Sequence, residues 1–292
     1  MDLDGSGAGS PEGLVRLILQ ALPGTDAPIQ IEALCRSLDI SEIQLLDSEG
    51  YEGGLITDPE RSTGIILVNG QAGLERRRFT IAHELGHFLI PTHIPNVDGR
   101  FLCSRKDMLA LGAKEGDRRA RMEAEANRFA SLVLVPPPIL RKKFAGLSGP
   151  GLIEVFDLAR EFQVSKEVMA RNFAEHYATA SAVILVHDGK VIRSYRNRNF
   201  PYMAPSRGGP VPRQSTFWKI NDRPALEGHF QGVPFGTWLG DDNPRADLLE
   251  QVILQTNGRA MIMLQLESPS EDDDDPDENQ RLIESWRVGF RR

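Results

Sequence analysis

The spacing of apolar residues predicts mainly helices, with short strands, in the first 178 residues. Apolar residues recur at helical spacing in four stretches, 13–22, 29–38, 75–90 and 117–135. Pro91 ends the third helix, and a triplet of prolines at 136–138 ends the fourth. Short apolar runs between 43 and 69 read as strands, with a turn at 58–63. The stretch 92–117 is mixed and predicts no element.

The pattern changes near residue 178. Before it, 149–177 reads as two helices separated at 163–165, where Ser165 is a suitable N-cap. After it, two apolar runs flank Asp188-Gly189, which is typical of a β-hairpin. We expect 248–254 to be helical and 259–266 to be a strand. The expected fold is therefore α+β, with a helical part followed by a β-rich part.

The charge is concentrated in one segment. The formal charge is −7, yet 267–278 alone holds eight acidic residues and no basic one. The rest of the chain has 33 acidic and 34 basic residues, which weighs against a surface built to cradle nucleic acid. Two distant cysteines exclude a disulfide scaffold. Apolar stretches are too short for a membrane span, and the acidic, Gly/Ser-rich N-terminus is unlike a signal peptide, so we expect a cytoplasmic protein with no membrane partner.

The segment FTIAHELGHFLIP contains the pattern His-Glu-x-x-His, as His83, Glu84 and His87. In a helix, residues four apart lie on one face, so both imidazoles can bind one metal ion. Glu84 lies beside them, where a carboxylate can take a proton from a metal-activated water. The pattern therefore predicts a catalytic zinc site with Glu84 as general base.

A catalytic zinc needs a third protein ligand, and three residues are candidates. His93 follows His87 by six residues, but the glycine that usually turns the chain between such ligands is absent. Glu123 and Glu125 lie in the helix predicted over 117–135 and point to different sides of it. We prefer Glu123, because Asn127 shares its face and can orient a histidine ligand. Cys103 is a weaker candidate, since it has no partner cysteine.

Two segments, RRRFTIAHELGHFLI and EAEANRFASLVLVP, resemble the ImmA/IrrE family of metallopeptidases. The resemblance is strongest over about 28–138 and implies a zincin-like, mainly helical core with a small N-terminal sheet. It implies that His83, His87 and Glu123 bind Zn²⁺, with Mn²⁺ as an alternative, and that Glu84 is the general base. It also implies a protein substrate, a helix-turn-helix repressor whose cleavage relieves repression in a stress or mobile-element response.

The resemblance continues through LIEVFDLAREFQVSKEVMARNFAEH, which is similar to the helix-turn-helix segment of that family. Lys166, Arg171 and Asn172 on its second helix could read bases. Glu167 and Glu175 on the same helix oppose DNA, so contact with DNA is not favoured. The last third resembles β-rich C-terminal regions that are compared with GAF-like sensor folds.

These observations divide the chain into six parts. We expect a flexible tail (1–12), a metallopeptidase domain (13–147), a helix-turn-helix segment (148–178), a β-rich domain (179–266), an acidic linker (267–280) and a tail packing on that domain (281–292). The function we expect is a zinc-dependent endopeptidase. The alternative is a metal-stabilised regulator that binds DNA or a repressor through its helix-turn-helix without cutting it.

Overall fold

A computed structural model describes residues 9–47, 52–95, 100–103, 117–147, 149–240 and 248–266. Its first part holds a four-stranded mixed sheet in the order β1-β3-β2-β4. The strands are β1 (Ile40–Leu46), β2 (Gly53–Thr57), β3 (Gly64–Asn69) and β4 (Arg100–Cys103). Strands β1 and β3 are parallel, and the other neighbours are antiparallel. The small N-terminal sheet is present, and β4 adds a strand where no element was predicted.

Two helices precede this sheet, α1 (Pro11–Ala21) and α2 (Ile31–Ser37). Helix α1 begins two residues earlier than predicted, so the expected tail at 1–12 is too long. Pro11 fits the first turn of a helix, and the Ser10 hydroxyl accepts a hydrogen bond from the Gly13 backbone N–H. Residues 1–8 of that predicted tail lie outside the described residues.

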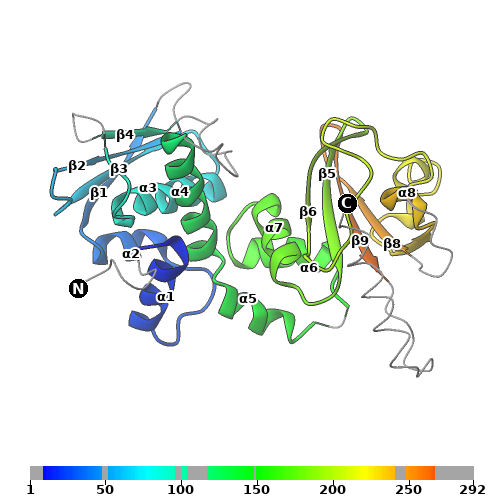
Figure 1. The fold of residues 1–292 in the computed structure, drawn as a ribbon, viewed down its shortest axis with the longest axis horizontal. Coiled ribbons are helices and arrows are strands. Elements are labelled where there is room, and N and C mark those ends of the chain that lie inside the picture. Colours follow the sequence, from blue (N-terminus) through cyan, green and yellow to red (C-terminus); the bar gives the residue numbers. More distant parts are fainter. Residues whose placement is uncertain are drawn as a thin grey trace, which may run out of the picture.

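Helix α3 (Leu74–Leu89) packs against β2 and β3, and α4 (Arg118–Leu134) packs along α3 (Figure 1). Gly86 lets these two helices approach closely. A Cβ atom at Gly86 would lie 3.0 Å from Phe129 Cδ1 and 3.3 Å from Ala126 Cα. The close approach holds the middle of α4 against the His-Glu-x-x-His segment.

Three helices lie between this part and the C-terminal sheet (Figure 1). They are α5 (Pro137–Phe144), α6 (Leu152–Glu161) and α7 (Lys166–His176). The proline triplet ends α4, as predicted, and its last two members also begin α5, because proline is well tolerated in a first helical turn. The predicted break between α6 and α7 is confirmed, and Ser165 Oγ accepts a hydrogen bond from Val168 N at 3.2 Å.

The C-terminal part is a five-stranded antiparallel sheet in the order β6-β5-β9-β8-β7. Its strands are β5 (Ser181–His187), β6 (Lys190–Arg196), β7 (Gln231–Val233), β8 (Leu248–Leu254) and β9 (Arg259–Leu266). The predicted hairpin is confirmed, since Asp188 and Gly189 both have positive φ angles, as its tight turn requires. The predicted helix at 248–254 is wrong. Its apolar run suits either element, and pairing with β7 and β9 on its two edges makes it a strand.

The core is continuous across the predicted boundary near 178. One apolar cluster extends from α1 through α7 and reaches Val183, Met261 and Met263 of the C-terminal sheet. A second cluster, which includes the fully buried Trp238, belongs to the C-terminal part alone. Polar contacts reinforce the junction, because Leu152 N donates to Gln251 Oε1 at 2.6 Å. The chain therefore has the expected α+β composition, with α6 and α7 shared between its two parts.

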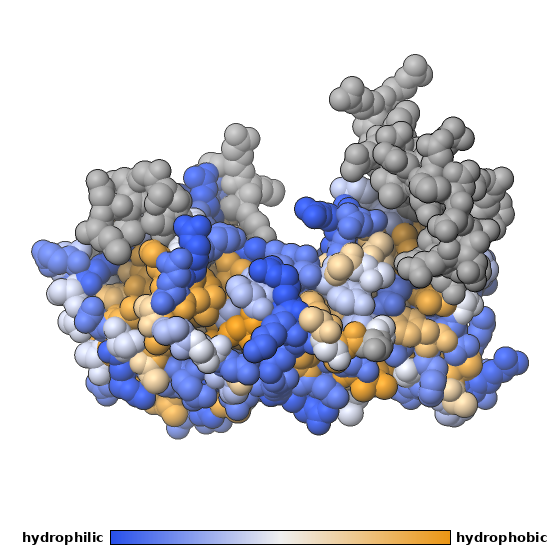
Figure 2. Space-filling model, turned by 90° about the horizontal axis from the view of Figure 1, so that it is seen from below, coloured by the Kyte–Doolittle hydropathy of each residue, from blue (hydrophilic) through white to orange (hydrophobic). Residues whose placement is uncertain are grey.

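On the face shown in Figure 2, apolar and hydrophilic residues are interspersed. Among the described residues, no helix is both long and apolar enough to cross a membrane. A short helix, α8 (Gly236–Leu239), carries Trp238 into the second cluster. The predicted acidic linker (267–280) and C-terminal tail (281–292) lie outside the described residues.

Candidate metal centre

The packing of α3 on α4 brings His83, His87 and Glu123 together. His83 Nε2 lies 3.1 Å from His87 Nε2, and Glu123 Oε2 lies 3.2 Å from the first nitrogen and 3.6 Å from the second. All three side chains are buried. Among the described residues, these three form a group whose ligand atoms lie close enough together to hold one metal ion.

The separations of these atoms suit zinc. Ligand atoms at about 2.0–2.2 Å from a tetrahedral zinc ion lie about 3.3–3.6 Å from one another. The three observed separations fall within about 0.2 Å of that range. The residues therefore fit a His₂Glu site, the ligand set of several catalytic zinc centres.

The protonation states of the ligands also suit a cation. Burial lowers the pKa of His87 to about 3, which keeps the imidazole neutral. For Glu123, burial acts to raise the pKa, but the close contacts with the His83 and His87 rings outweigh it and hold the pKa well below its usual range. A neutral imidazole and an ionised carboxylate are the forms that bind a metal ion.

Asn127 lies where the sequence places a supporting group. Its Oδ1 is 3.0 Å from His83 Nδ1. An amide oxygen only accepts, so His83 Nδ1 must donate, and Nε2 keeps a lone pair for the metal. Asn127 is buried one helical turn after Glu123, and the same face of α4 therefore supplies a candidate ligand and its support.

Glu84 is fully buried in α3, next to His83. Burying a carboxylate costs free energy, and a metal site with a purely structural role would not require a carboxylate at this position. The sequence-based role of Glu84 as general base stays a prediction.

His93 and Glu125, the other two third-ligand candidates, lie apart from the metal-binding atoms. His93 Nδ1 is 2.9 Å from His87 Nδ1, and His93 Nε2 is 3.0 Å from Glu125 Oε2. His93 therefore contacts His87 from the side opposite its Nε2, and Glu125 contacts His93. Sequence reasoning missed this pairing, because His93 and Glu125 lie on different segments and no spacing rule links them. The side chain of Cys103 lies outside the described part of the chain.

The ring of Phe101, on β4, stacks on His87 with centroids 4.8 Å apart. It covers one face of the imidazole with an apolar group. The edge strand of the sheet thus closes the site on one side.

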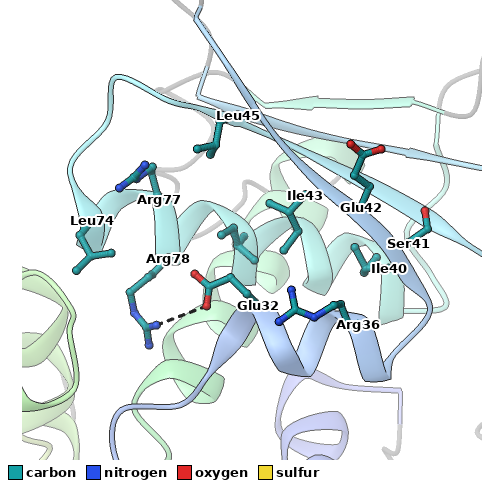
Figure 3. Close-up of a pocket in the computed structure, with 11 residues that line it drawn as sticks. Glu32, Arg36, Ile40, Ser41, Glu42, Ile43, Leu45, Leu74, Arg77 and Arg78 are labelled. Atoms are coloured by element: carbon teal, nitrogen blue, oxygen red, sulfur yellow. Dashed lines mark ion pairs between the residues drawn. The ribbon is translucent and has the colours of Figure 1, made fainter.

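A groove of about 490 Å³ lies on the opposite face of α3 (Figure 3). Leu74, Arg77, Arg78 and Ile81 of α3 line it, and Ile81 points about 200° around the helix from His83. Arg78 faces Glu32 across it, with 4.0 Å between the charged atoms, and its Nη2 donates to Ile29 O at 2.6 Å. The groove is therefore separate from the metal-binding cluster.

Two of the three candidate base-reading residues of α7, Lys166 and Asn172, make contacts within the protein. Asn172 is buried and donates to Ser131 Oγ of α4 at 2.9 Å. Lys166 Nζ lies 4.1 Å from the centroid of the Phe156 ring. Glu167 accepts a hydrogen bond from the Tyr195 hydroxyl at 2.8 Å, which ties the start of α7 to β6. In this arrangement α7 acts as a packing element between the two parts of the chain.

Part of this chain is similar in sequence to known peptidases. Residues 37–173, which include the whole cluster, match the model of the IrrE N-terminal-like domain of peptidase family M78. Over 155 residues, or 52% of this chain, the sequence is 31% identical to the radiation response metalloprotease IrrE of Deinococcus radiodurans. The chain spans 41% of that relative's length. A solved Mycobacterium tuberculosis transcriptional regulator aligns with 87% of this chain and 75% of its own, at a TM-score of 0.47 and 14% identity.

Proposed function

We propose that this chain carries an IrrE N-terminal-like domain of metallopeptidase family M78 and acts as a zinc-dependent endopeptidase. The observation that carries the proposal is the buried cluster of His83, His87 and Glu123, whose spacing suits a tetrahedral ion. Zinc is the proposed metal, and manganese is the alternative. We also propose that the first part of the chain is a zincin-like core.

When bound, zinc would polarise the scissile carbonyl and acidify a water molecule. The protein's own contribution is to hold the ligands and to move protons. Asn127 orients His83, and Glu84 takes the proton of the attacking water and later delivers it to the leaving amine. Burial keeps bulk water from competing with these transfers.

The proposed substrate is a helix-turn-helix repressor, cleaved to relieve repression in a stress or mobile-element response. Its support is the resemblance of the two motif segments to the ImmA/IrrE family. The alternative, a regulator that binds DNA through α7 without cleaving a protein, is less favoured. Asn172 is buried, and Glu167, which accepts a hydrogen bond from Tyr195 of β6, places a negative charge at the start of α7 that opposes DNA.

For the C-terminal part, we propose a GAF-like sensor role for residues 179–266. The antiparallel sheet with α6 and α7 packed against it supports this proposal. The boundary at residue 178 would then divide two functions but not two hydrophobic cores, because the first apolar cluster continues across it.

The test is cleavage of a repressor encoded beside this protein, followed by mass spectrometry of the fragments. Protein loaded with zinc or manganese should cut, and chelator-treated protein should not. Glu84→Gln should bind metal as before but lose at least about 10²-fold in rate, as expected for the loss of a general base. Glu75→Gln, in the first turn of the same helix, is the matched control and should cut normally. Intact repressor in every condition, or equal cleavage by Glu84→Gln, would refute the proposal.

A further inference from the structure

We propose that His93 and Glu125 form a relay that fixes the tautomer of His87 and so presents its Nε2 to the metal. The inference rests on the proposed metal site and adds two positioning residues to it. Its basis is a chain of three side chains from three segments. His87 Nδ1 and His93 Nδ1 are 2.9 Å apart, and His93 Nε2 and Glu125 Oε2 are 3.0 Å apart.

The direction of each hydrogen bond follows from the end of the chain. An ionised carboxylate only accepts, so His93 Nε2 must carry the proton that it donates to Glu125. A neutral imidazole has one donor and one acceptor nitrogen, and His93 Nδ1 is therefore the acceptor. His87 Nδ1 must then be the donor, which leaves the lone pair on His87 Nε2. That nitrogen is the one that faces His83 and Glu123.

The tautomer of the other histidine ligand, His83, is set by a single hydrogen bond. His83 Nδ1 meets the amide oxygen of Asn127 directly. The two ligands are thus oriented by different outer groups, one by a buried amide and the other by a histidine and a carboxylate. The Glu125 side chain is 35% exposed, so the relay extends from the buried site toward the surface.

The segment that carries His93 is held in place. Arg61 Nη1 donates to Ile90 O at 2.8 Å and lies within 3.5 Å of His87 O, at the end of α3. His93 N then donates to Ile90 O at 3.1 Å, which closes a turn. His93 itself is fully buried. These contacts return the chain to His87 after α3 ends and set the His93 ring against it.

The test measures zinc affinity in competition with a chromophoric chelator, without any substrate. His93→Leu keeps an apolar group in the buried site but removes both hydrogen bonds, and it should weaken zinc binding roughly 10- to 100-fold. His93→Gln should stay within a few-fold of the wild-type protein, because its amide oxygen can accept from His87 and its amide nitrogen can donate to Glu125.

Variants of Glu125 separate acceptor chemistry from charge. Glu125→Gln can still accept from His93 and should retain zinc affinity within a few-fold. Glu125→Lys can only donate, which reverses the relay, and it should weaken binding about as much as His93→Leu. Glu161→Lys is the matched control, since Glu161 is also a half-exposed helical glutamate, paired with Lys143. It should leave zinc affinity unchanged.

Nitrogen NMR of the metal-free protein gives a readout that a general loss of packing does not move. His87 should carry its proton on Nδ1 in the wild-type protein and in Glu125→Gln, and not in Glu125→Lys. Thermal unfolding of each metal-free variant verifies that it folds. Wild-type zinc affinity in His93→Leu, or a proton on His87 Nε2 in the wild-type protein, would overturn the relay. A failure of repressor cleavage would instead count against the proposed function and leave these binding results standing.

Discussion

Replacing Gly86 with alanine should weaken zinc binding without unfolding the protein. The added methyl group would lie 3.0 Å from Phe129 Cδ1 and 3.3 Å from Ala126 Cα. Carbon atoms pack comfortably at about 3.5–4.0 Å, so α3 and α4 must separate by several tenths of an ångström. Metal–ligand distances tolerate only about 0.2 Å, and Glu123 lies on the helix that moves.

The stability of the metal-free protein should change little, because two effects oppose each other. Overpacking costs about 1–3 kcal/mol, while alanine is favoured over glycine within a helix by about 1 kcal/mol. The net cost is therefore about 0–2 kcal/mol. We expect zinc affinity to fall at least about tenfold, which removes about 1.4 kcal/mol of stabilisation by the bound metal.

The assay is thermal unfolding with and without saturating zinc, together with chelator competition. The zinc-induced rise in Tm should be smaller in Gly86→Ala than in the wild-type protein. Gly73→Ala, at the N-cap of the same helix, is the control, since its nearest contact would be an ordinary 3.8 Å to Glu75 Oε2. Unchanged zinc affinity in Gly86→Ala would refute the idea that this helix spacing places Glu123.

Three further predictions concern buried ionisable groups. Glu250 accepts hydrogen bonds through both carboxylate oxygens, one of them from Thr216 N at 2.6 Å. Glu250→Gln should therefore lower the free energy of unfolding in urea by about 1–3 kcal/mol. Glu227→Gln should lower it little, because the amide oxygen can still accept the hydrogen bond from Leu254 N. Burial raises the pKa of Cys35 to about 12, so this thiol should resist alkylation at pH 8 in the native protein; labelling as fast as in urea would contradict this. Because burial lowers the pKa of His87 from 6.5 to about 3, the unfolded chain binds more protons between these values, and metal-free protein should lose stability as the pH falls from 6.5 toward 3. A chelator-treated sample whose urea midpoint is the same at pH 7 and pH 5 would contradict the last prediction.

Local backbone geometry explains what could be predicted without a structure. The spacing of His83 and His87 places them on one face of any helix, whatever surrounds it. Ser165 and the Asp188-Gly189 turn act within a few residues of themselves, and both behave as predicted. The ends of α3 and α4 also follow from local signals, the prolines and the change of apolar spacing.

Tertiary packing decided the rest. Glu123 meets the histidines because Gly86 lets α4 approach α3, and the distance between two helices is not a property of either sequence segment alone. The same packing brings His93 and Glu125 together, and no regular spacing in the sequence predicts their contact. The run at 248–254 became a strand because β7 and β9 supply hydrogen-bond partners on both edges. The sequence by itself therefore determined which residues could bind a metal ion, while contacts between distant segments determined which of them lie close enough to do so.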